Sequence, residues 1–261
     1  MIKFMNLADE YSKDNSFFSV LPIEYEKNLT YGKGASKGPK EIIKASHHLE
    51  YYDEQFDAEP FLKGIKTIES VEEITNNFTI TLGGDHSVTI QVVKELEKYH
   101  DDFSVIILDA HPDMFNSWNG SQTNHRCTAQ RISANHKTLL VGVRSMDVDE
   151  VSVIKNNENV EMIKAYDFNE NTFKKELSKL KNKVYVSIDV DVFDPSFIRN
   201  TGTPEPGGFM WDQVIEILKT IFKEKEVIGS DIVEFAPNEN FEAEAYSLAK
   251  LAHKIMSLKI S

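Results

Sequence analysis

Six segments of the chain are rich in apolar and β-branched residues over strand-like lengths, as expected for strands buried on both faces of a sheet. Five others repeat apolar residues at helical spacing. This alternation predicts a mostly parallel sheet covered by helices on both sides. The expected strands are Ser16–Ile23, Phe78–Leu82, Ser104–Leu108, Thr138–Val143, Val184–Val190 and Val227–Val233. The expected helices are Pro39–Tyr52, Ser87–Tyr99, Thr172–Lys181, Trp211–Phe222 and Phe241–Leu258, the last with Phe241, Ala245, Leu248, Ala252 and Ile255 on one face.

The pattern predicts a single domain over residues 1–261, because it contains no repeat, low-complexity tract or linker-like change of composition. The longest irregular stretch is Met114–Asn124, which is rich in Asn, Ser, Gly, Trp and Gln. Irregular loops positioned by a rigid scaffold often carry binding residues. We therefore expect substrate contacts in this segment.

Composition and charge narrow the classes of partner. The chain has 41% hydrophobic residues and a net charge of −13, which argues against a nucleic-acid partner and favours a cationic ligand. Cys127 is the single cysteine, so no internal disulfide can form. No signal-like segment or run of about 18 uncharged apolar residues occurs. We expect a cytoplasmic protein that does not bind membranes.

Candidate chemistry lies in three short segments, each at or just past the carboxyl end of an expected strand, where open parallel sheets collect functional residues. They are Gly83–Ser87 (GGDHS), Asp109–Asp113 (DAHPD) and Ser187–Pro195 (SIDVDVFDP). Together they supply two histidines and at least four carboxylates, the ligand types of a two-metal site. Taken singly, Asp85 is more typical of a helix cap or Asx turn, and Asp194-Pro195 of a turn.

The four aspartates at positions 109, 113, 189 and 191 would repel one another if the fold brings them together. Each close pair costs roughly 4 kcal/mol at 4 Å in an effective dielectric of 20. Two divalent ions balance four carboxylates and leave neutral His86 and His111 to complete the ligand shells. Mixed carboxylate and imidazole ligands favour Mn²⁺, with Ni²⁺, Co²⁺ or Zn²⁺ as alternatives.

Other site motifs do not fit the sequence. A calcium loop beginning at Asp189 would place Asp194 where glycine is needed. The glycine-containing segment 32–38 has Lys37 where phosphate-binding and dinucleotide-binding loops need glycine. The blocks expected of a two-metal phosphoesterase, Gly-Asn-His-Asp/Glu and Gly-His-x-His, do not occur.

With these residues in view, the chain resembles the ureohydrolase family, which includes arginase and agmatinase. GGDHS, DAHPD and SIDVDVFDP resemble the three metal signatures of that family. Further blocks resemble it in the same order, at Gly34–Ile43 (GASKGPKEII), Thr201–Gly208 (TGTPEPGG) and Gly229–Pro237 (GSDIVEFAP). The resemblance implies a three-layer α/β/α arginase-like fold with about eight mostly parallel strands, two Mn²⁺ ions per subunit, and a homotrimer or homohexamer.

The resemblance also implies roles for individual residues. One metal would be held by His86, Asp109, Asp113 and Asp189, and the other by His111, Asp109, Asp189 and Asp191. Asp113 would also hydrogen-bond the bridging hydroxide, Glu234 would pair with the guanidinium group, and a protonated His125 would deliver a proton to the leaving amine. Further substrate contacts are expected at Asn116, Trp118 and Thr203. Cys127 is expected to be structural.

The expected reaction is hydrolysis of agmatine, a small cationic guanidine, to putrescine and urea. Glu205 in TGTPEPGG resembles the agmatinase form, as does the interval from Asp113 to His125, and the Met114–Asn124 loop has no Lys or Arg to meet a substrate carboxylate. Neutral groups in the loop leave arginine, guanidinobutyrate, guanidinopropionate, guanidine and formiminoglutamate as alternatives. A metal-binding paralog without hydrolytic activity is a rival of a different class.

Overall fold

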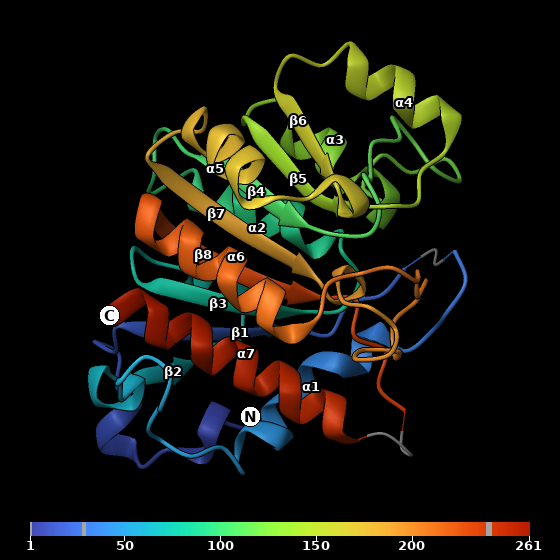
Figure 1. Cartoon of the computed structure of the whole chain (residues 1–261). Helices are drawn as coiled ribbons and strands as arrows, with labels where there is room; N and C mark the ends of the chain where they lie inside the picture. The colour runs from blue at the N-terminus through green and yellow to red at the C-terminus, as the bar shows by residue number, and fades with distance from the viewer. Residues whose placement is uncertain (1, 28–29, 239–241) are drawn as a thin grey trace.

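A single sheet of eight strands, all parallel, forms the centre of the protein (Figure 1). The computed structural model describes residues 2–27, 30–238 and 242–261. The strand order is β2-β1-β3-β8-β7-β4-β5-β6. The strands are β1 (Phe18–Ile23), β2 (Ile65–Thr67), β3 (Phe78–Gly83), β4 (Ser104–Leu108), β5 (Thr138–Val143), β6 (Val160–Lys164), β7 (Lys183–Asp189) and β8 (Glu226–Val233).

Helices cover both faces of this sheet and give it three layers. One face carries α1 (Gly38–Ser46), α5 (Glu170–Ser178), α6 (Trp211–Glu224) and α7 (Glu242–Ile260). The other carries α2 (Val88–Leu96), α3 (Thr128–Ile132) and α4 (Val148–Lys155). Figure 1 shows α5, α6 and α7 in front of the strands. Alternate side chains of β4 enter opposite cores, since Ile106 packs with the first group and Ile107 with the second.

The six strands expected from the apolar pattern are all present, each within two residues of its expected ends. Two edge strands were not expected. β2 has only three residues, and β6 has the sequence VEMIK, in which charged residues interrupt the apolar run. Edge strands bury less surface than central strands, so their apolar signal is weaker. The capping box of Asp147 and Glu150, readable in the sequence, marks the start of α4, which was also not expected.

Helix ends differ more from expectation. α1 ends at Ser46 rather than Tyr52. The Ser46 hydroxyl donates to the Ile43 carbonyl and accepts from the Met5 backbone N–H, so it competes with continuation of the helix. α7 runs to Ile260, and its expected first residue, Phe241, lies outside the described residues.

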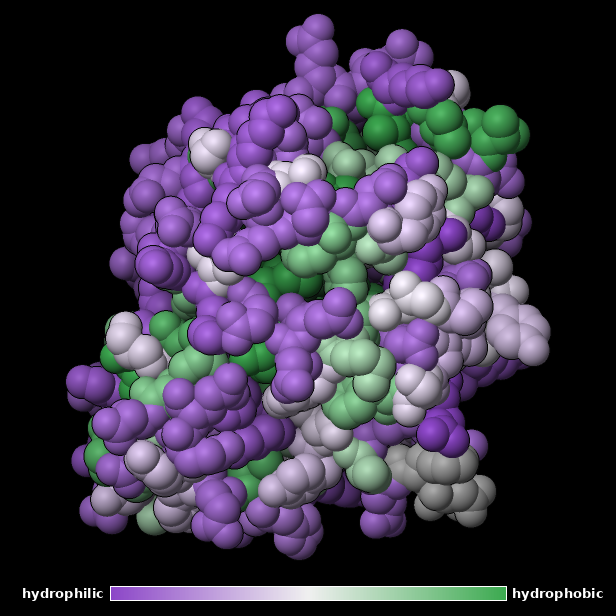
Figure 2. Space-filling model, in the orientation of Figure 1, coloured by the Kyte–Doolittle hydropathy of each residue, from purple (hydrophilic) through white to green (hydrophobic). Residues whose placement is uncertain are grey.

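The surface in Figure 2 is mainly hydrophilic, as the high content of charged residues leads one to expect. Hydrophilic residues cover most of the face shown in Figure 2, and hydrophobic residues gather near the position of α4, whose Val148 is 78% exposed. None of the helices in the described part of the chain combines the length and apolar character that a membrane crossing requires.

The order of the central strands positions the site. β3, β8, β7 and β4 are neighbours, although they come from distant parts of the chain. β3 leads into α2 on one face of the sheet, whereas its neighbour β8 leads toward α7 on the other, so these two connections leave in different directions at the carboxyl ends. In open α/β sheets such a switch point creates a crevice. The GGDHS, DAHPD and SIDVD segments and Glu234 all follow these four strands.

Candidate active site

A cavity of about 330 Å³ lies at the carboxyl ends of the central strands. Metal-ligand-type side chains, the expected catalytic side chains and parts of three loops all contribute to its wall. The lining residues used below are His111, Asp113, His125, Arg126, Asp147, Glu150, Asp189, Asp191, Thr203, Glu205 and Glu234. The second and third strand-end segments that the sequence singled out therefore meet at this cavity.

Backbone N–H groups orient three of the aspartates. Asp109 Oδ1 accepts from the N–H of His111 at 2.6 Å, and Asp189 Oδ1 accepts from that of Asp191 at 2.9 Å. Asp191 Oδ1 accepts from the N–H of Ala110 at 3.0 Å. The first two bonds are local Asx turns, which an aspartate two residues before the donor readily forms. Each carboxylate thus turns its second oxygen toward a histidine of the site, Asp109 and Asp189 toward His86 and Asp191 toward His111.

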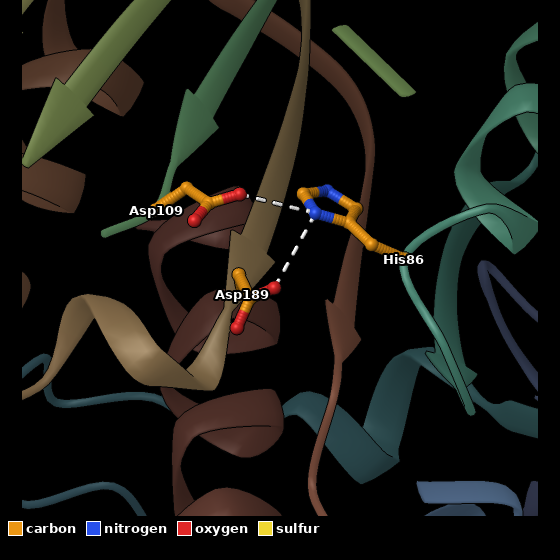
Figure 3. Close-up of side chains that lie close together, drawn as sticks. All are labelled: His86, Asp109 and Asp189. Carbon is orange, nitrogen blue, oxygen red and sulfur yellow. Dashed lines mark ion pairs between the residues drawn. The ribbon is translucent and has the colours of Figure 1, made fainter. Parts of the chain in front are cut away.

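His86 lies against these free oxygens (Figure 3). Its Nδ1 is 3.1 Å from Asp109 Oδ2, 3.2 Å from Asp113 Oδ2 and 3.3 Å from Asp189 Oδ2. His86 Nδ1 and Asp109 Oδ2 are both buried, and neither has a hydrogen-bond partner in the described structure. Buried polar atoms without partners cost about 1–3 kcal/mol each. Acceptor atoms converging in this way are the arrangement that a divalent cation satisfies.

A second group of ligand-type atoms shares Asp109. His111 Nδ1 is 2.9 Å from Asp191 Oδ2 and 3.6 Å from Asp109 Oδ1. The ligand atoms of His86, Asp109 and Asp189 lie within 4.8 Å of one another, as do those of Asp109, His111 and Asp191. Two neighbouring groups joined by Asp109 fit a pair of metal ions. Ligation by Asp113 and a second bridge through Asp189 stay predictions.

A buried hydrogen-bond relay fixes the orientation of His86. Its Nε2 is 3.0 Å from Ser187 Oγ, whose own hydrogen is donated to Asp231 Oδ1 at 2.6 Å. Ser187 therefore accepts from His86 Nε2–H, and Nδ1 faces the carboxylates. Asp231 Oδ2 accepts from the hydroxyls of Thr89 and Tyr185, both at 2.8 Å. Burial raises the pKa of Asp231, and these donors oppose that shift. Sequence reasoning did not identify this relay.

The crowded charges perturb the protonation of the ligand-type groups. Burial disfavours the charged form of His111, but the Asp191 carboxylate overcomes this effect and raises the pKa to about 12. Burial, and then the charge of Asp109, raise the pKa of Asp113 to about 7. Burial and the charge of Asp191 raise the pKa of Asp189 well above its usual value. The protein alone cannot hold all these carboxylates ionised and close together without extra positive charge.

Glu234 lies beside this centre at the end of β8. It is 8% exposed, and its Oε1 accepts from the backbone N–H of His86 at 2.7 Å. Burial, and then the nearby Asp85 carboxylate, raise its pKa to about 8. Glu234 and Asp113 both have positive φ, 66° and 49°, which is uncommon for residues other than glycine. Met5, Asn6, Asp57 and Asn119 share this feature elsewhere in the described chain, so the expected roles of Glu234 and Asp113 depend on their positions at the cavity.

His125 also lines the cavity, from the start of the segment that leads into α3. Its Nε2 is 2.9 Å from the Thr30 hydroxyl, and its buried Nδ1 has no partner in the described structure. Burial, and then the positive charge of His86, lower its pKa to about 4. At pH 7 the ring is therefore neutral. The expectation that a protonated His125 delivers a proton to the leaving amine therefore requires the ring to gain that proton during the reaction.

Arg144 is a site residue that sequence reasoning missed. It directly follows β5, and its guanidinium donates to backbone carbonyls on two loops beside the site. Nη2 lies 2.6 Å from the Asp191 carbonyl oxygen and 2.7 Å from that of Glu205. The Glu205 carboxylate in turn lies 3.8 Å from His111 Nε2. The sequence feature that could have identified Arg144 is its position, a charged residue directly after an expected buried strand.

The expected substrate contacts divide into two groups. Thr203 lines the cavity, but neither Asn116 nor Trp118 is among the described lining residues. The Asn116 side chain accepts from Gln130 instead, and the Trp118 ring stacks under the guanidinium of Arg126, 4.0 Å from its centroid. Arg126 itself lines the cavity. The Met114–Asn124 loop itself contains no Lys or Arg, but Arg126, two residues after the loop, places a positive charge at the cavity.

Two residues have the structural roles expected of them. Asp85 Oδ1 accepts from the Ser87 backbone and hydroxyl, and Oδ2 accepts from the Lys27 backbone, so Asp85 forms a turn rather than a ligand. Cys127 is buried, and burial raises the pKa of its thiol, which disfavours the reactive thiolate.

Comparison with known proteins gives a consistent result. Residues 17–258 match the arginase family. The chain is 34% identical to an agmatinase from Pyrococcus horikoshii, covering 97% of this chain and 95% of the relative. It is 33% identical to an N(1)-aminopropylagmatine ureohydrolase from Thermus thermophilus, covering 92% and 89%. The solved agmatine ureohydrolase of Thermoplasma volcanium superposes with a TM-score of 0.87 at 25% identity, over 100% of this chain and 94% of that one.

The family match extends over all eight strands of the sheet and over every segment that lines the cavity. The eight-stranded parallel fold agrees with solved agmatinase and arginase structures. The chain belongs to the arginase family and is an amidinohydrolase.

Proposed function

We propose that the protein hydrolyses agmatine to putrescine and urea, with a pair of Mn²⁺ ions as its cofactor. One ion would be held by His86, Asp109, Asp113 and Asp189, and the other by His111, Asp109, Asp189 and Asp191. When bound, such a pair lowers the pKa of a shared water and supplies hydroxide at neutral pH. Mixed imidazole and carboxylate ligands without thiolate support Mn²⁺.

One observation carries this proposal. The unpartnered His86 Nδ1 faces three carboxylate oxygens, and the backbone N–H of the same residue holds the Glu234 carboxyl group. A single residue therefore connects the ligand-type atoms to the buried carboxyl group of Glu234, which lines the cavity. A guanidinium group held by that anion would lie beside the metals.

The side chains divide the remaining chemistry between them. Glu234 would pair with the guanidinium and present its planar face, and the cation would favour the ionised form of this carboxyl group. Asp113 would accept a hydrogen bond from the attacking hydroxide. The neutral His125 would take up the proton that the nucleophilic water gives up and deliver it to the leaving amine as the bond between the guanidinium carbon and that amine breaks. Thr30 would hold the ring through its Nε2.

N(1)-aminopropylagmatine is the second candidate substrate. It is favoured by relatives of that name in Thermus thermophilus and Synechocystis, at 33% and 31% identity. Its hydrolysis would release spermidine in place of putrescine. For the assembly and setting, we propose a cytoplasmic homotrimer or homohexamer, as the likeness to the family implies.

The test is product release from a panel of compounds by the Mn²⁺-loaded protein. Urea would be measured with agmatine, N(1)-aminopropylagmatine, arginine, guanidinobutyrate, guanidinopropionate and guanidine, and formamide with formiminoglutamate. Highest kcat/KM with agmatine would support the proposal. Higher kcat/KM with another member would replace the substrate while keeping the chemistry. No product from any member, with Mn²⁺, Ni²⁺, Co²⁺ or Zn²⁺, would favour a non-hydrolytic metal-binding protein.

A further inference from the structure

The charged residues that line the cavity outside the metal cluster differ in how fully they are engaged. Glu150 accepts from the backbone N–H groups of Met114 and Asp147. Asp147 caps α4 by accepting from the N–H of Asp149. These carboxylates are committed to the scaffold. The carboxylate of Glu205 and the guanidinium of Arg126 also line the cavity, but neither makes a hydrogen bond to the backbone in the described structure.

The guanidinium of Arg126 is held by stacking alone. It lies 4.4 Å from the centroid of Phe115 and 4.0 Å from that of Trp118, and the two rings are 4.9 Å apart. Stacking over a ring face fixes the plane of a guanidinium but uses none of its N–H donors. Within the described residues, the recorded contacts of this guanidinium are the two aromatic rings, and the hydrogen bond of Arg126 to Asn124 comes from its backbone N–H. A fixed positive charge with open donors therefore forms part of the cavity wall.

The Glu205 carboxylate and the Arg126 guanidinium lie at different depths in the cavity. Glu205 is next to the metal cluster, since its carboxylate is 3.8 Å from His111 Nε2. Arg126 and its supporting rings are half-buried, and the loop residues between and beyond those rings are exposed, so this part of the wall faces outward. A substrate that enters with its guanidinium toward Glu234 would have its first ammonium group near the inner anion. Anything attached beyond that group would approach the outer cation.

We propose that Arg126 is a specificity-determining residue that selects against substrates carrying a second ammonium group beyond the amine of agmatine. The inference rests on the proposed function and distinguishes its two candidate substrates. Agmatine ends at its first amine, whereas N(1)-aminopropylagmatine carries a further positive charge on a three-carbon extension. Like charges in a partly desolvated cavity repel. The charge of Arg126 interacts with that of Glu150, but the two groups form no ion pair in the described structure, because the Glu150 carboxylate is held by two backbone N–H groups. Removing the guanidinium would therefore leave the outer wall more favourable to a second ammonium group.

The experiment compares the two substrates and their two products in the Mn²⁺-loaded protein. The wild type, Arg126→Gln, Arg126→Lys and Lys33→Gln are each assayed for urea release from agmatine and N(1)-aminopropylagmatine. Binding of putrescine and spermidine is measured by calorimetry on the same samples. Lys33 is exposed and does not line the cavity, so Lys33→Gln is a matched control for loss of one positive charge. Metal content and Tm confirm that each variant is folded and loaded.

In Arg126→Gln we expect the preference for agmatine over N(1)-aminopropylagmatine to fall about tenfold, which corresponds to about 1.4 kcal/mol, mainly through KM. The preference for putrescine over spermidine should fall in parallel. Arg126→Lys and Lys33→Gln should keep the wild-type ratios. Unchanged ratios in Arg126→Gln, or an equal change in Lys33→Gln, would overturn the inference. Absence of urea from both substrates would refute the proposed function, and the product-binding ratios would still decide the role of Arg126.

Discussion

Replacing Ser187 with alanine tests whether the buried relay behind His86 supports the metal centre. Ser187 Oγ lies 3.0 Å from His86 Nε2 and 2.6 Å from Asp231 Oδ1. Removing the hydroxyl leaves His86 Nε2–H without an acceptor, and leaves Asp231 Oδ1 with only the N–H of Ile188, at 3.3 Å. The ring is then free to rotate or to move its proton to Nδ1, where it blocks metal binding.

Two magnitudes follow from these contacts. Each buried group that loses its partner costs about 1–3 kcal/mol of folding stability. Partners that orient metal-binding histidines typically contribute about 10–100-fold to metal affinity. We expect Ser187→Ala to show both effects. Mn²⁺ affinity would be measured by competition with a fluorescent chelator, and stability by denaturant unfolding of the metal-free protein.

Ser230→Ala is the matched control, because Ser230 is equally buried on the neighbouring strand β8 and donates to the Val186 carbonyl at 2.7 Å. It should lose stability by a similar mechanism, about 1 kcal/mol for one hydrogen bond, while keeping its metal affinity. Equal Mn²⁺ affinities in the two variants would refute the relay as a support of the metal centre and leave it a purely structural network.

The other predictions concern the ligands, the guanidinium anchor and pH. Asp189→Asn should lose both bound metal and urea release, as measured by elemental analysis and a urea assay; full metal content would contradict its bridging role. Glu234→Gln should keep the metal, since an amide oxygen still accepts from the His86 N–H, and kcat/KM should fall about 10–150-fold for a charge-assisted bond worth about 1.5–3 kcal/mol. Wild-type kcat/KM in that variant would show that the carboxylate does not anchor the guanidinium. The pKa of His111 is raised to about 12 and that of Asp113 to about 7, so in the metal-free protein these groups hold protons at neutral pH that a metal must displace. Mn²⁺ affinity should therefore rise from about pH 5 to pH 8 with release of protons, detectable by calorimetry in buffers of different ionisation enthalpy; affinity independent of pH would contradict these shifts.

Much of the fold was predictable from local patterns. The six strands that form the interior of the sheet are nearly continuous in apolar residues because helices cover both of their faces. The edge strands β2 and β6 bury less surface and leave a weaker pattern. Helix ends depend on single contacts with distant residues, such as the bond between Ser46 and the Met5 backbone, and no local pattern records them.

The same division holds for the site. The sequence by itself placed aspartates and histidines directly after buried strands, and Asx turns of two-residue spacing then orient Asp109 and Asp189 wherever the fold puts them. What lies behind and around those ligands was decided only by the tertiary structure. The strand order brings Ser187 of β7 between His86 and Asp231, and folding of the loop after Asp113 brings the Arg126 charge to the cavity wall. The identity of the metal ligands can be read from short segments. The orientation of the His86 N–H and the charge at the cavity wall depend instead on which distant segments lie side by side in the folded protein.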